Sequence, residues 1–381
     1  MEDDSSIVIK EVNTKAELKT FVEFEHKLYK GNDYYVPSLL ESELETLDRE
    51  VNPAFEYCDA IYFLAYRGDE VVGRIAGICN YKANDIWNQS QVRFGWFDYI
   101  DDLAVSQKLM QAVEEWGREK GCEAVHGPMG FTDQDKEGML VEGFDQLGTM
   151  ITYYNYPYYI RHMEYMGFEK DTDWVEYKVY VPSSIPEKHI RMGNIVREKY
   201  GLRVVKFRKK KEIMPYARDI FYLLNDTYKH LYGYVELTDK QIDQLAGQYI
   251  NFLQLDFCSF IVREADNALV GFGITMPSMS RALQKAKGKL FPTGFIHLLR
   301  AVNAKRPEVV DMLLISVAEE YQNKGVNALI FEDLIPIMNK YHVRYLESNP
   351  ELETNASVSL QWKYFKRVRH KRRRAYIKEL D

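Results

Sequence analysis

The chain repeats one series of predicted elements, and this internal repeat limits the folds that it can adopt. Each half opens with a short β-branched run and an amphipathic helical stretch. These segments are residues 7–12 and 14–29 in the first half and residues 202–207 and 211–232 in the second. A predicted hairpin follows in each half, with Gly73 and Gly271 at equivalent places, 271 − 73 = 198 residues apart. The sequence therefore predicts two copies of one α/β unit.

Each half then continues with a strand, a helix and a strand. We expect these elements at residues 93–98, 106–120 and 123–126 and at residues 311–317, 325–340 and 343–347. Asn155 and Asn355 open an aromatic segment in each copy, 355 − 155 = 200 residues apart. Any two α/β domains share some of this order, but the turn placement and the two Asn positions favour duplication. The second copy carries an insertion at residues 280–306.

Length and composition agree with two folded domains. The chain has 381 residues, 46% of them hydrophobic and 28% charged, which excludes disordered and low-complexity classes. Two prolines and two serines in residues 181–186 predict a linker. We therefore expect an N-terminal domain over residues 1–182 and a C-terminal domain over residues 187–381.

Charge and cysteine usage limit the possible partners and the compartment. The net charge of −7 argues against a protein that wraps duplex nucleic acid, and the four cysteines are scattered singly. The acidic N-terminus argues against a secretory signal, and no apolar run reaches the length of a membrane span. These features predict a cytoplasmic protein without a membrane span.

A polar turn between a buried strand and a helix, within residues 312–330, is the most informative stretch. The N-terminus of a helix offers unpaired N–H groups and partial positive charge, so it can hold a pyrophosphate where small residues allow close approach. Gly325 and Ala328 are such residues, and Lys324 adds a positive charge.

This stretch resembles motif A of the GNAT superfamily of acyl-CoA N-acyltransferases, in which a [Gln/Arg]-x-x-Gly-x-[Gly/Ala] loop grips the CoA pyrophosphate. The matching residues are Val317, Glu320, Tyr321, Gln322, Lys324, Gly325, Val326 and Leu329. Glu319 replaces a frequent Pro, and Asn327 occupies the second Gly/Ala position. The resemblance implies the α/β (α+β) fold class, with two tandem GNAT-like domains that each have a mixed central sheet flanked by helices. It also implies acetyl-CoA or another acyl-CoA as co-substrate and a small-molecule or peptide amine as acceptor.

The resemblance further implies the site residues. A backbone N–H on the central strand helps to hold the thioester carbonyl, and the residues expected to bind the cofactor are Ile315, Val317, Gln322, Lys324, Gly325, Asn327, Ala328 and Asn355. The acid that protonates the thiolate is frequently a Tyr seven residues after the motif Asn, but 355 + 7 = 362 is Trp362 here. Tyr364 is the nearest hydroxyl and is our candidate for that acid.

A general base must come from other residues. Asp311 and Glu347 flank predicted strand ends, and His297 lies in the insertion. Of these we select Asp311, although a lone strand-end acid is more often structural. No Ser/His/Asp set, Cys/His set or metal-binding pattern stands out, so hydrolase and metalloenzyme interpretations are weak.

The first copy lacks the features of a CoA site. Its equivalent turn, residues 100–107, has two acids and no glycine, which repels and crowds a diphosphate. Residues 164–168 still resemble the terminal Tyr-Glu-Lys-x-Gly-Phe motif of the family. These observations predict one working site and one scaffold half.

Two further segments leave alternatives open. The loop at residues 127–138 and the tyrosines at residues 153–159 could recognise a polar substrate or pack between the halves. The basic run at residues 363–376 could meet the CoA 3′-phosphate, an RNA or anionic lipid, or it could be solvated or neutralised by the acidic remainder of the chain.

The favoured function is acyl-CoA-dependent N-acyl transfer. A catalytically silent GNAT-fold binding protein is one alternative, suggested by Asn327 and Trp362. Aminoacyl transfer from tRNA is another, because tandem GNAT-like folds also occur in the Fem family, although no Fem-specific motif is visible.

Overall fold

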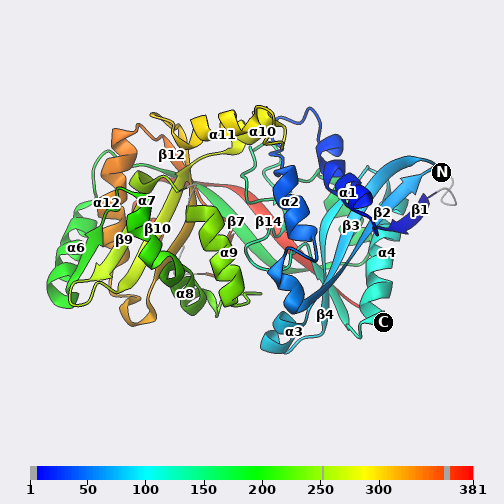
Figure 1. The fold of residues 1–381 in the computed structure, drawn as a ribbon, viewed down its shortest axis with the longest axis horizontal. Helices are drawn as coiled ribbons and strands as arrows, with labels where there is room; N and C mark the ends of the chain where they lie inside the picture. The colour runs from blue at the N-terminus through cyan, green and yellow to red at the C-terminus, as the bar shows by residue number, and fades with distance from the viewer. Residues whose placement is uncertain (1–6, 251–252, 356–360, 381) are drawn as a thin grey trace. The chain divides into compact units, whose positions relative to one another are not determined.

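The computed structural model describes residues 7–250, 253–355 and 361–380 (Figure 1). The chain divides into two compact units, and neither is one continuous segment. Unit 1 consists of Met1–Val175, Ser280–Leu298 and Lys371–Asp381, and unit 2 consists of Glu176–Met279 and Leu299–His370.

Unit 1 is built on a mixed sheet in the order β1-β2-β3-β4-β5-β14. Its neighbouring strands are antiparallel except for the parallel pair β4 and β5. The strands are β1 Ile7–Glu11, β2 Cys58–Arg67, β3 Glu70–Asn80, β4 Gln91–Tyr99, β5 Ala124–Gly127, β6 Met139–Glu142, β7 Glu169–Tyr180 and β14 Arg367–Glu379. The helices of the first half are α1 Lys15–Leu28, α2 Leu40–Leu47, α3 Tyr81–Trp87, α4 Leu103–Glu119 and α5 Tyr158–Tyr165, with a 3-10 turn η2 Pro53–Glu56.

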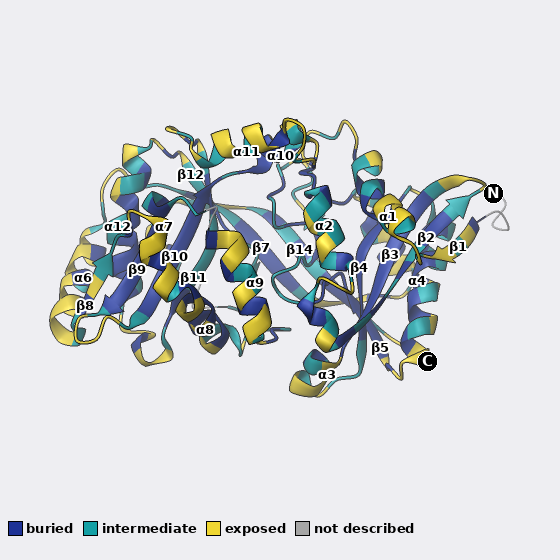
Figure 2. Cartoon of the chain, viewed as in Figure 1, coloured by how far each residue is buried: buried dark blue, intermediate teal, exposed yellow. Residues whose placement is uncertain are grey.

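Helices cover both faces of the unit 1 sheet, because its strands bury side chains on both sides (Figure 2). One apolar cluster joins α1 and α2 to residues such as Leu64 and Ile78, and a second joins α4 and α5 to Ile75 and Phe94. The first helix, α1, begins where the sequence predicts, at a capping box between Thr14 and Glu17.

Unit 2 repeats this architecture with the strand order β7-β12-β11-β10-β9-β8. The pair β11 and β12 is parallel, as β4 and β5 are in unit 1. Its strands are β8 Leu202–Val205, β9 Cys258–Arg263, β10 Leu269–Pro277, β11 Val309–Val317, β12 Tyr345–Glu347 and β13 Glu351–Leu352. Its helices are α6 Glu187–Tyr200, α7 Lys210–Ile213, α8 Ala217–Tyr228, α9 Asp239–Tyr249 and α12 Asn327–Lys340. The 3-10 turns are η3 Met214–Tyr216, η5 Leu255–Phe257, η6 Glu319–Tyr321 and η7 Trp362–Tyr364.

The unit 2 sheet is also covered on both faces. One cluster joins α7, α8 and α9 to Phe260 and Phe272, and the other joins α6 and α12 to Ile261 and Val317. The insertion at residues 280–306 forms α10 Ser280–Ala286 and α11 Gly294–Val302. The predicted α/β architecture with two tandem GNAT-like halves is confirmed.

The last strand of each half crosses from one unit to the other. In unit 1, residues 124–127 of β5 pair with residues 376–379 of β14, which ends the second half. In unit 2, residues 345–347 of β12 pair with residues 178–180 of β7, which ends the first half. The contiguous domains expected from the linker therefore differ from the compact units, and whether either domain folds alone stays a prediction.

The basic run near the C-terminus lies largely inside a sheet. Its later part is in β14, where Lys371 and Arg373 are each 1% exposed. Arg372 and Arg374 donate hydrogen bonds to the buried carboxylate of Asp173, at 2.7 and 2.8 Å. The buried part of the run therefore does not form a surface patch, because Arg372 and Arg374 neutralise an internal acid.

Across the described ranges no helix has the length and apolar character needed to cross a membrane.

Candidate active site

The two central strands of unit 2 separate at a pair of acids. Strands β11 and β12 pair only over three residues each, and this pairing ends at Asp311 opposite Glu347. Beyond Asp311, β11 continues to Val317 and keeps β10 as its neighbour. The strand β11 therefore has one paired edge and one open edge over its second half.

The hydrogen bonds of β11 show which backbone groups face the open edge. Ala318 N–H donates to Val270 O at 2.9 Å, and antiparallel pairing alternates from residue to residue. Ser316 therefore faces β10, and the N–H groups of Ile315 and Val317 point away from it. A register shift between Ile274 and Thr275 opposite β11 marks a bulge at the start of this segment.

Side chains satisfy the carbonyl groups along this edge. Tyr228 Oη donates to Ile315 O at 3.0 Å, and Gln322 Nε2 donates to Val317 O at 3.1 Å. Asn349 Nδ2 donates to Leu313 O. The edge therefore presents N–H donors while its acceptors are already used.

The turn after β11 leads directly into the N-terminus of α12. Val326 is the N-cap residue and provides no side-chain hydrogen bond, so the first N–H groups of α12 have no capping side chain. Lys324 is exposed beside this turn, and its ammonium group lies over the rings of Tyr200 and Tyr321. The turn thus combines a positive helix end with a lysine, as an anion site requires.

Gly325 has two reasons to be glycine. Its φ of +81° lies in the left-handed region, and a Cβ there would come within 2.4 Å of Met192 Cγ in α6. Met192 therefore fills the space on one side of Gly325. A ligand has to approach this turn from the side of its N–H groups.

Comparisons with known proteins agree on this architecture. A tandem GNAT protein from the clavulanic acid biosynthesis pathway matches 98% of this chain and 99% of its own length, with a TM-score of 0.54 and 12% identity. A GCN5-related N-acetyltransferase from Sphaerobacter thermophilus matches 98% and 96%, with a TM-score of 0.50 and 12% identity. The chain has the tandem GNAT fold.

Two curated relatives also match over most of their length. Protein YghO of Escherichia coli K12 is 26% identical over 96% of this chain and 94% of its own. A bacterial ceramide synthase of Caulobacter vibrioides is 28% identical over 82% and 80%. No protein-family model matches the sequence.

In this GNAT fold, the acid pair lies at the point where the sheet opens. Asp311 and Glu347 are 3% and 5% exposed, and as partners in parallel strands they point to the same face of the sheet. His370 Nε2 of β14 lies 2.7 Å from Glu347 Oε1. The structure thus brings together two of the three predicted base candidates and adds His370, which the sequence marks only as part of the basic run. The third, His297, lies in α11.

Tyr228 is the hydroxyl that the structure places on the open edge. It is the last residue of α8, and burial raises the pKa of its phenol to about 12. It is therefore protonated at neutral pH and can donate a proton or a hydrogen bond. No sequence motif singles it out, because its role depends on how α8 packs on β11.

Tyr364, the acid predicted from the sequence, lies in a different environment. It is 45% exposed in η7, where Lys188 Nζ of α6 donates to its hydroxyl and lowers its pKa. Its neighbour Trp362 is buried and donates from Nε1 to Glu351 Oε1 at 2.8 Å. The hydroxyl of Tyr228 bonds a carbonyl group of β11, whereas that of Tyr364 bonds Lys188.

The remaining predicted cofactor-binding residues surround the turn or support it. Ala328 is buried and its N–H donates to Gly325 O at 3.0 Å, so it closes the first turn of α12. Asn327 begins the helix, and Asn355 N–H donates to Leu352 O at 2.9 Å. Their contacts with a cofactor stay predictions. The aromatic segment after Asn355 falls partly on residues 356–360, outside the described residues.

The equivalent edge in the first GNAT half is occupied by its own side chains. Tyr99 of β4 corresponds to Val317, because it pairs with Gly73 as Val317 pairs with Gly271. Tyr159 Oη accepts from Tyr99 N–H at 3.1 Å, and the hydroxyl of Tyr158 donates to Tyr99 O. Tyr158 and Tyr159, whose role the sequence did not decide, therefore pack inside unit 1. They fill the edge of β4, whereas the corresponding edge of β11 in unit 2 is open.

The helix after β4 is also closed to anions. Asp102 is the N-cap of α4, and its side chain accepts from Ala104 N–H at 2.9 Å. A carboxylate thus occupies the position that a pyrophosphate would need, and it forms an ion pair with Arg67. These contacts support the expectation that the first half does not bind CoA in the family manner.

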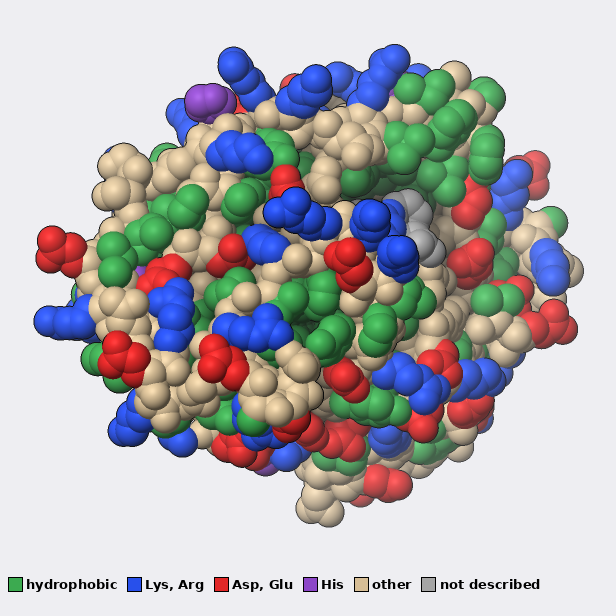
Figure 3. Space-filling view, turned by 60° about the vertical axis from the view of Figure 1, so that its left-hand side comes forward, with side chains coloured by type: hydrophobic (Ala, Val, Ile, Leu, Met, Phe, Trp, Pro, Cys, Tyr) green, Lys and Arg blue, Asp and Glu red, His purple; other side chains and the backbone are tan. Residues whose placement is uncertain are grey.

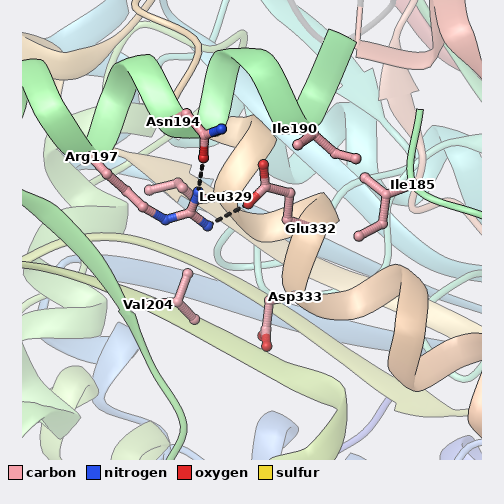
Figure 4. Close-up of a pocket in the computed structure, with 8 residues that line it drawn as sticks. All are labelled: Ile185, Ile190, Asn194, Arg197, Val204, Leu329, Glu332 and Asp333. Atoms are coloured by element: carbon pink, nitrogen blue, oxygen red, sulfur yellow. Dashed lines mark hydrogen bonds and ion pairs between the residues drawn. The ribbon is translucent and has the colours of Figure 1, made fainter. Parts of the chain in front are cut away.

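A hollow in unit 2 lies between α6, α12 and β8 (Figure 4). It has a volume of about 360 Å³ and apolar walls from Ile185, Ile190, Val204 and Leu329. Its charged groups are paired, Arg197 with Glu332 and Lys206 with Asp333. The strand that borders this hollow, β8, is the far edge strand of the sheet, with β9 and β10 between it and β11.

Within the described part of the chain, no group of three or more His, Cys, Asp or Glu side chains has an arrangement that could hold a metal ion.

Proposed function

We propose that this protein is an acyl-CoA-dependent N-acyltransferase whose donor site lies in unit 2. The observation that carries the proposal is the open edge of β11, where Ile315 and Val317 N–H groups point away from β10 beside the uncapped N-terminus of α12. A thioester carbonyl needs such donors, and a pyrophosphate needs such a helix end.

The donor binds along this edge in a defined direction. The N–H groups of the turn and Lys324 hold the pyrophosphate, and Val317 N–H binds an amide carbonyl of the pantetheine arm. Ile315 N–H binds the thioester oxygen, on which negative charge develops during attack. Gln322 and Asn349 act as positioning residues, because they bond carbonyls of β11 and keep the edge straight.

The reaction then follows ordinary aminolysis of a thioester. A neutral amine attacks the thioester carbon and forms the C–N bond, and Asp311 accepts the proton that the amine loses, through water. The C–S bond breaks as the tetrahedral intermediate collapses. The thiolate of CoA takes a proton from Tyr228, which recovers its own from solvent. The contact between His370 and Glu347 fixes the charge and the orientation of the side chains beside Asp311.

The relatives indicate which acceptor to test first. One carries the name ceramide synthase, and ceramide formation joins a fatty acyl group to the amine of a long-chain amino alcohol. We therefore propose a fatty acyl-CoA as donor and a long-chain amino alcohol as acceptor.

Two measurements on the full chain test the proposal. Calorimetric titration with acetyl-CoA and palmitoyl-CoA should give saturable binding, and mass spectrometry should detect the amide after addition of sphinganine. The variant Asp311→Asn should keep donor binding and lose most turnover. Absence of binding at millimolar acetyl-CoA and at micromolar palmitoyl-CoA would refute the donor site, and binding without any amide product would favour a silent binding protein.

A further inference from the structure

The insertion of the second half carries an apolar helix that the protein does not bury. In α11, the side chains of Phe295, Ile296 and Leu299 are 39%, 36% and 53% exposed, and Phe291 just before the helix is 72% exposed. The rings of Phe291 and Phe295 lie 6.0 Å apart and form one surface. Gly294 is the one buried residue of this helix. Large apolar side chains gathered at one exposed place indicate a contact surface.

The same segment has a charge unlike the rest of the chain. Residues 267–307 contain no Asp or Glu. Their cations are Arg281, Lys285, Lys287, Lys289, Arg300, Lys305 and Arg306. The net charge of the chain is −7, so the remainder carries −7 − 7 = −14. The positive charge is thus concentrated where the exposed aromatic side chains are.

These cations are largely available for an external partner. Within the described residues, Lys289 has a carboxylate partner, Glu23 at 3.7 Å, whereas no ion pair is recorded for Lys285 or Lys287. In Figure 3, Lys and Arg side chains stand beside hydrophobic ones in the upper part of the view, where Figure 1 places α10 and α11.

The base of the segment is fixed although its tip is exposed. Gln284 Nε2 in α10 donates to Tyr35 O at 2.8 Å, and Leu40 N–H donates to Gly288 O at 2.8 Å. Ala282 and Leu283 of α10 are buried. Unit 1 therefore holds α10 in place while α11 and Phe291 remain at the surface.

We propose that α11 and the loop before it, residues 287–302, form a docking surface for an anionic membrane. Aromatic and aliphatic side chains enter the boundary between headgroups and acyl chains, and the lysines and arginines around them bind anionic headgroups. A second copy of the chain is a poorer occupant, because a symmetric contact would bring Lys287, Lys289 and Arg300 against the same cations of the other copy. Nucleic acid would match the cations but would leave the aliphatic side chains of α11 in water.

The test is co-sedimentation of the full chain with vesicles. The protein should sediment with vesicles of phosphatidylcholine and phosphatidylglycerol and much less with phosphatidylcholine alone, and high salt should weaken this binding. The double variant Phe291→Ser/Phe295→Ser should bind about tenfold more weakly, because it removes the inserted rings. The variant Lys285→Glu/Lys287→Glu should lose the preference for anionic lipid.

Matched controls change exposed side chains elsewhere. Val8 and Tyr165 are 51% and 68% exposed in unit 1, so Val8→Ser/Tyr165→Ser removes a similar apolar area and should leave vesicle binding unchanged. Lys19→Glu/Lys30→Glu repeats the charge change on exposed lysines of the first half.

Three outcomes would overturn the proposal. They are absence of binding to anionic vesicles, equal losses in the control variants, and a lipid-free dimer that Phe291→Ser/Phe295→Ser dissociates in sedimentation velocity. The proposal does not depend on the proposed function, because vesicle binding and acyl-CoA titration are separate measurements. The phenylalanine variant should titrate with acyl-CoA like the wild type.

Discussion

Arg74 is a fully buried cation in unit 1, and two acids neutralise it. Its guanidinium group lies 2.7 Å from Glu25 and 2.6 Å from Asp98, and Tyr29 donates to Asp98 at 2.8 Å. Replacing one member leaves an uncompensated charge in the interior, which is far more costly than losing an exposed ion pair.

We expect Arg74→Met to lower the free energy of unfolding by about 3–5 kcal/mol, because Glu25 and Asp98 would then face each other without a cation. Arg218→Met is the control, since Arg218 pairs with Asp243 at the surface, and it should destabilise the protein far less. Chemical denaturation followed by fluorescence measures both. Equal losses would show that the buried network is not the cause.

Glu351 gives a pH dependence with a definite sign. Burial raises the pKa of this carboxyl from 4.5 to about 7, while Trp362 and Arg367 oppose the shift. A raised pKa means that the folded protein favours the protonated acid, so this contribution to stability is present below pH 4.5 and is lost as the pH rises through about 7.

Glu351→Gln should therefore remove a pH dependence of roughly 2 kcal/mol between pH 5 and pH 8. The amide keeps an oxygen that accepts from Trp362 but cannot ionise. The measurement is urea denaturation of the wild type and the variant at both pH values. A difference that persists in the variant would assign the pH effect to another group.

Tyr228 and Tyr364 should contribute differently to the rate of the proposed reaction. Tyr228→Phe should lower kcat by about 10²-fold with little change in acyl-CoA affinity, because a hydroxyl near the thioester would be lost. Tyr364→Phe should have a small effect, since that hydroxyl contacts Lys188 at the surface. Steady-state kinetics compares the two, and the reverse order would support the acid predicted from the sequence.

The residues of the site differ in how far the sequence could identify them. The end of a predicted strand points to Asp311, and the resemblance of the neighbouring stretch to motif A points to Ile315 and Val317. Tyr228 and His370 come from α8 and β14, and only the packed structure brings them near β11 and Glu347. Spacing along the chain carries no information about such contacts.

Elements that look equivalent in the sequence differ at their ends. The helix α4 begins with a capping carboxylate, whereas α12 begins without a side-chain cap. The missing glycine and the two acids of the first turn predict a poor diphosphate site there, and the Asp102 cap supports that expectation. What the sequence did not predict is that Tyr158 and Tyr159 occupy the β4 edge, because a hydrogen bond between α5 and β4 leaves no periodic pattern.

Charge reversal at the two ends of α12 tests the anion site. Lys324→Glu should weaken acyl-CoA binding by about tenfold, because it places a carboxylate beside the N–H groups of the turn. Lys340→Glu makes the same charge change at the last residue of the helix and should leave binding almost unchanged. Calorimetric titration measures both, and similar losses would indicate only a long-range charge effect.

For the whole molecule, the most important feature is that β7 and β14 each run from one unit into the other. The predicted hairpins of both halves are present as β2–β3 and β9–β10, because their strands are neighbours in sequence. Pairing of β14 with β5 joins residues 376–379 to 124–127, and no local signal marks a partner so distant in sequence. Asp173 of β7 holds β14 in place electrostatically, with Lys170, Arg372 and Arg374 around it.

A chain that ends at His370 should therefore destabilise unit 1 although it lacks only the last residues of the second half. We expect amide hydrogens of β5 and β6 to lose protection from exchange, because both strands pair with β14. Amides of β9 and β10 should keep theirs. Hydrogen exchange with mass spectrometry resolves these segments, and unchanged protection in β5 would contradict the prediction.

Strand β14, which belongs to the second half but pairs with β5 in unit 1, also determines when unit 1 can complete its sheet during synthesis. Domains normally fold as they leave the ribosome, from the N-terminus onward. Here the edge of β5 and the carboxylate of Asp173 must wait for residues 371–379, which are translated only after the preceding part of the second half. A prematurely terminated chain would thus expose an unpaired strand edge and a buried acid in its otherwise complete first half, and cellular proteases could recognise such a product.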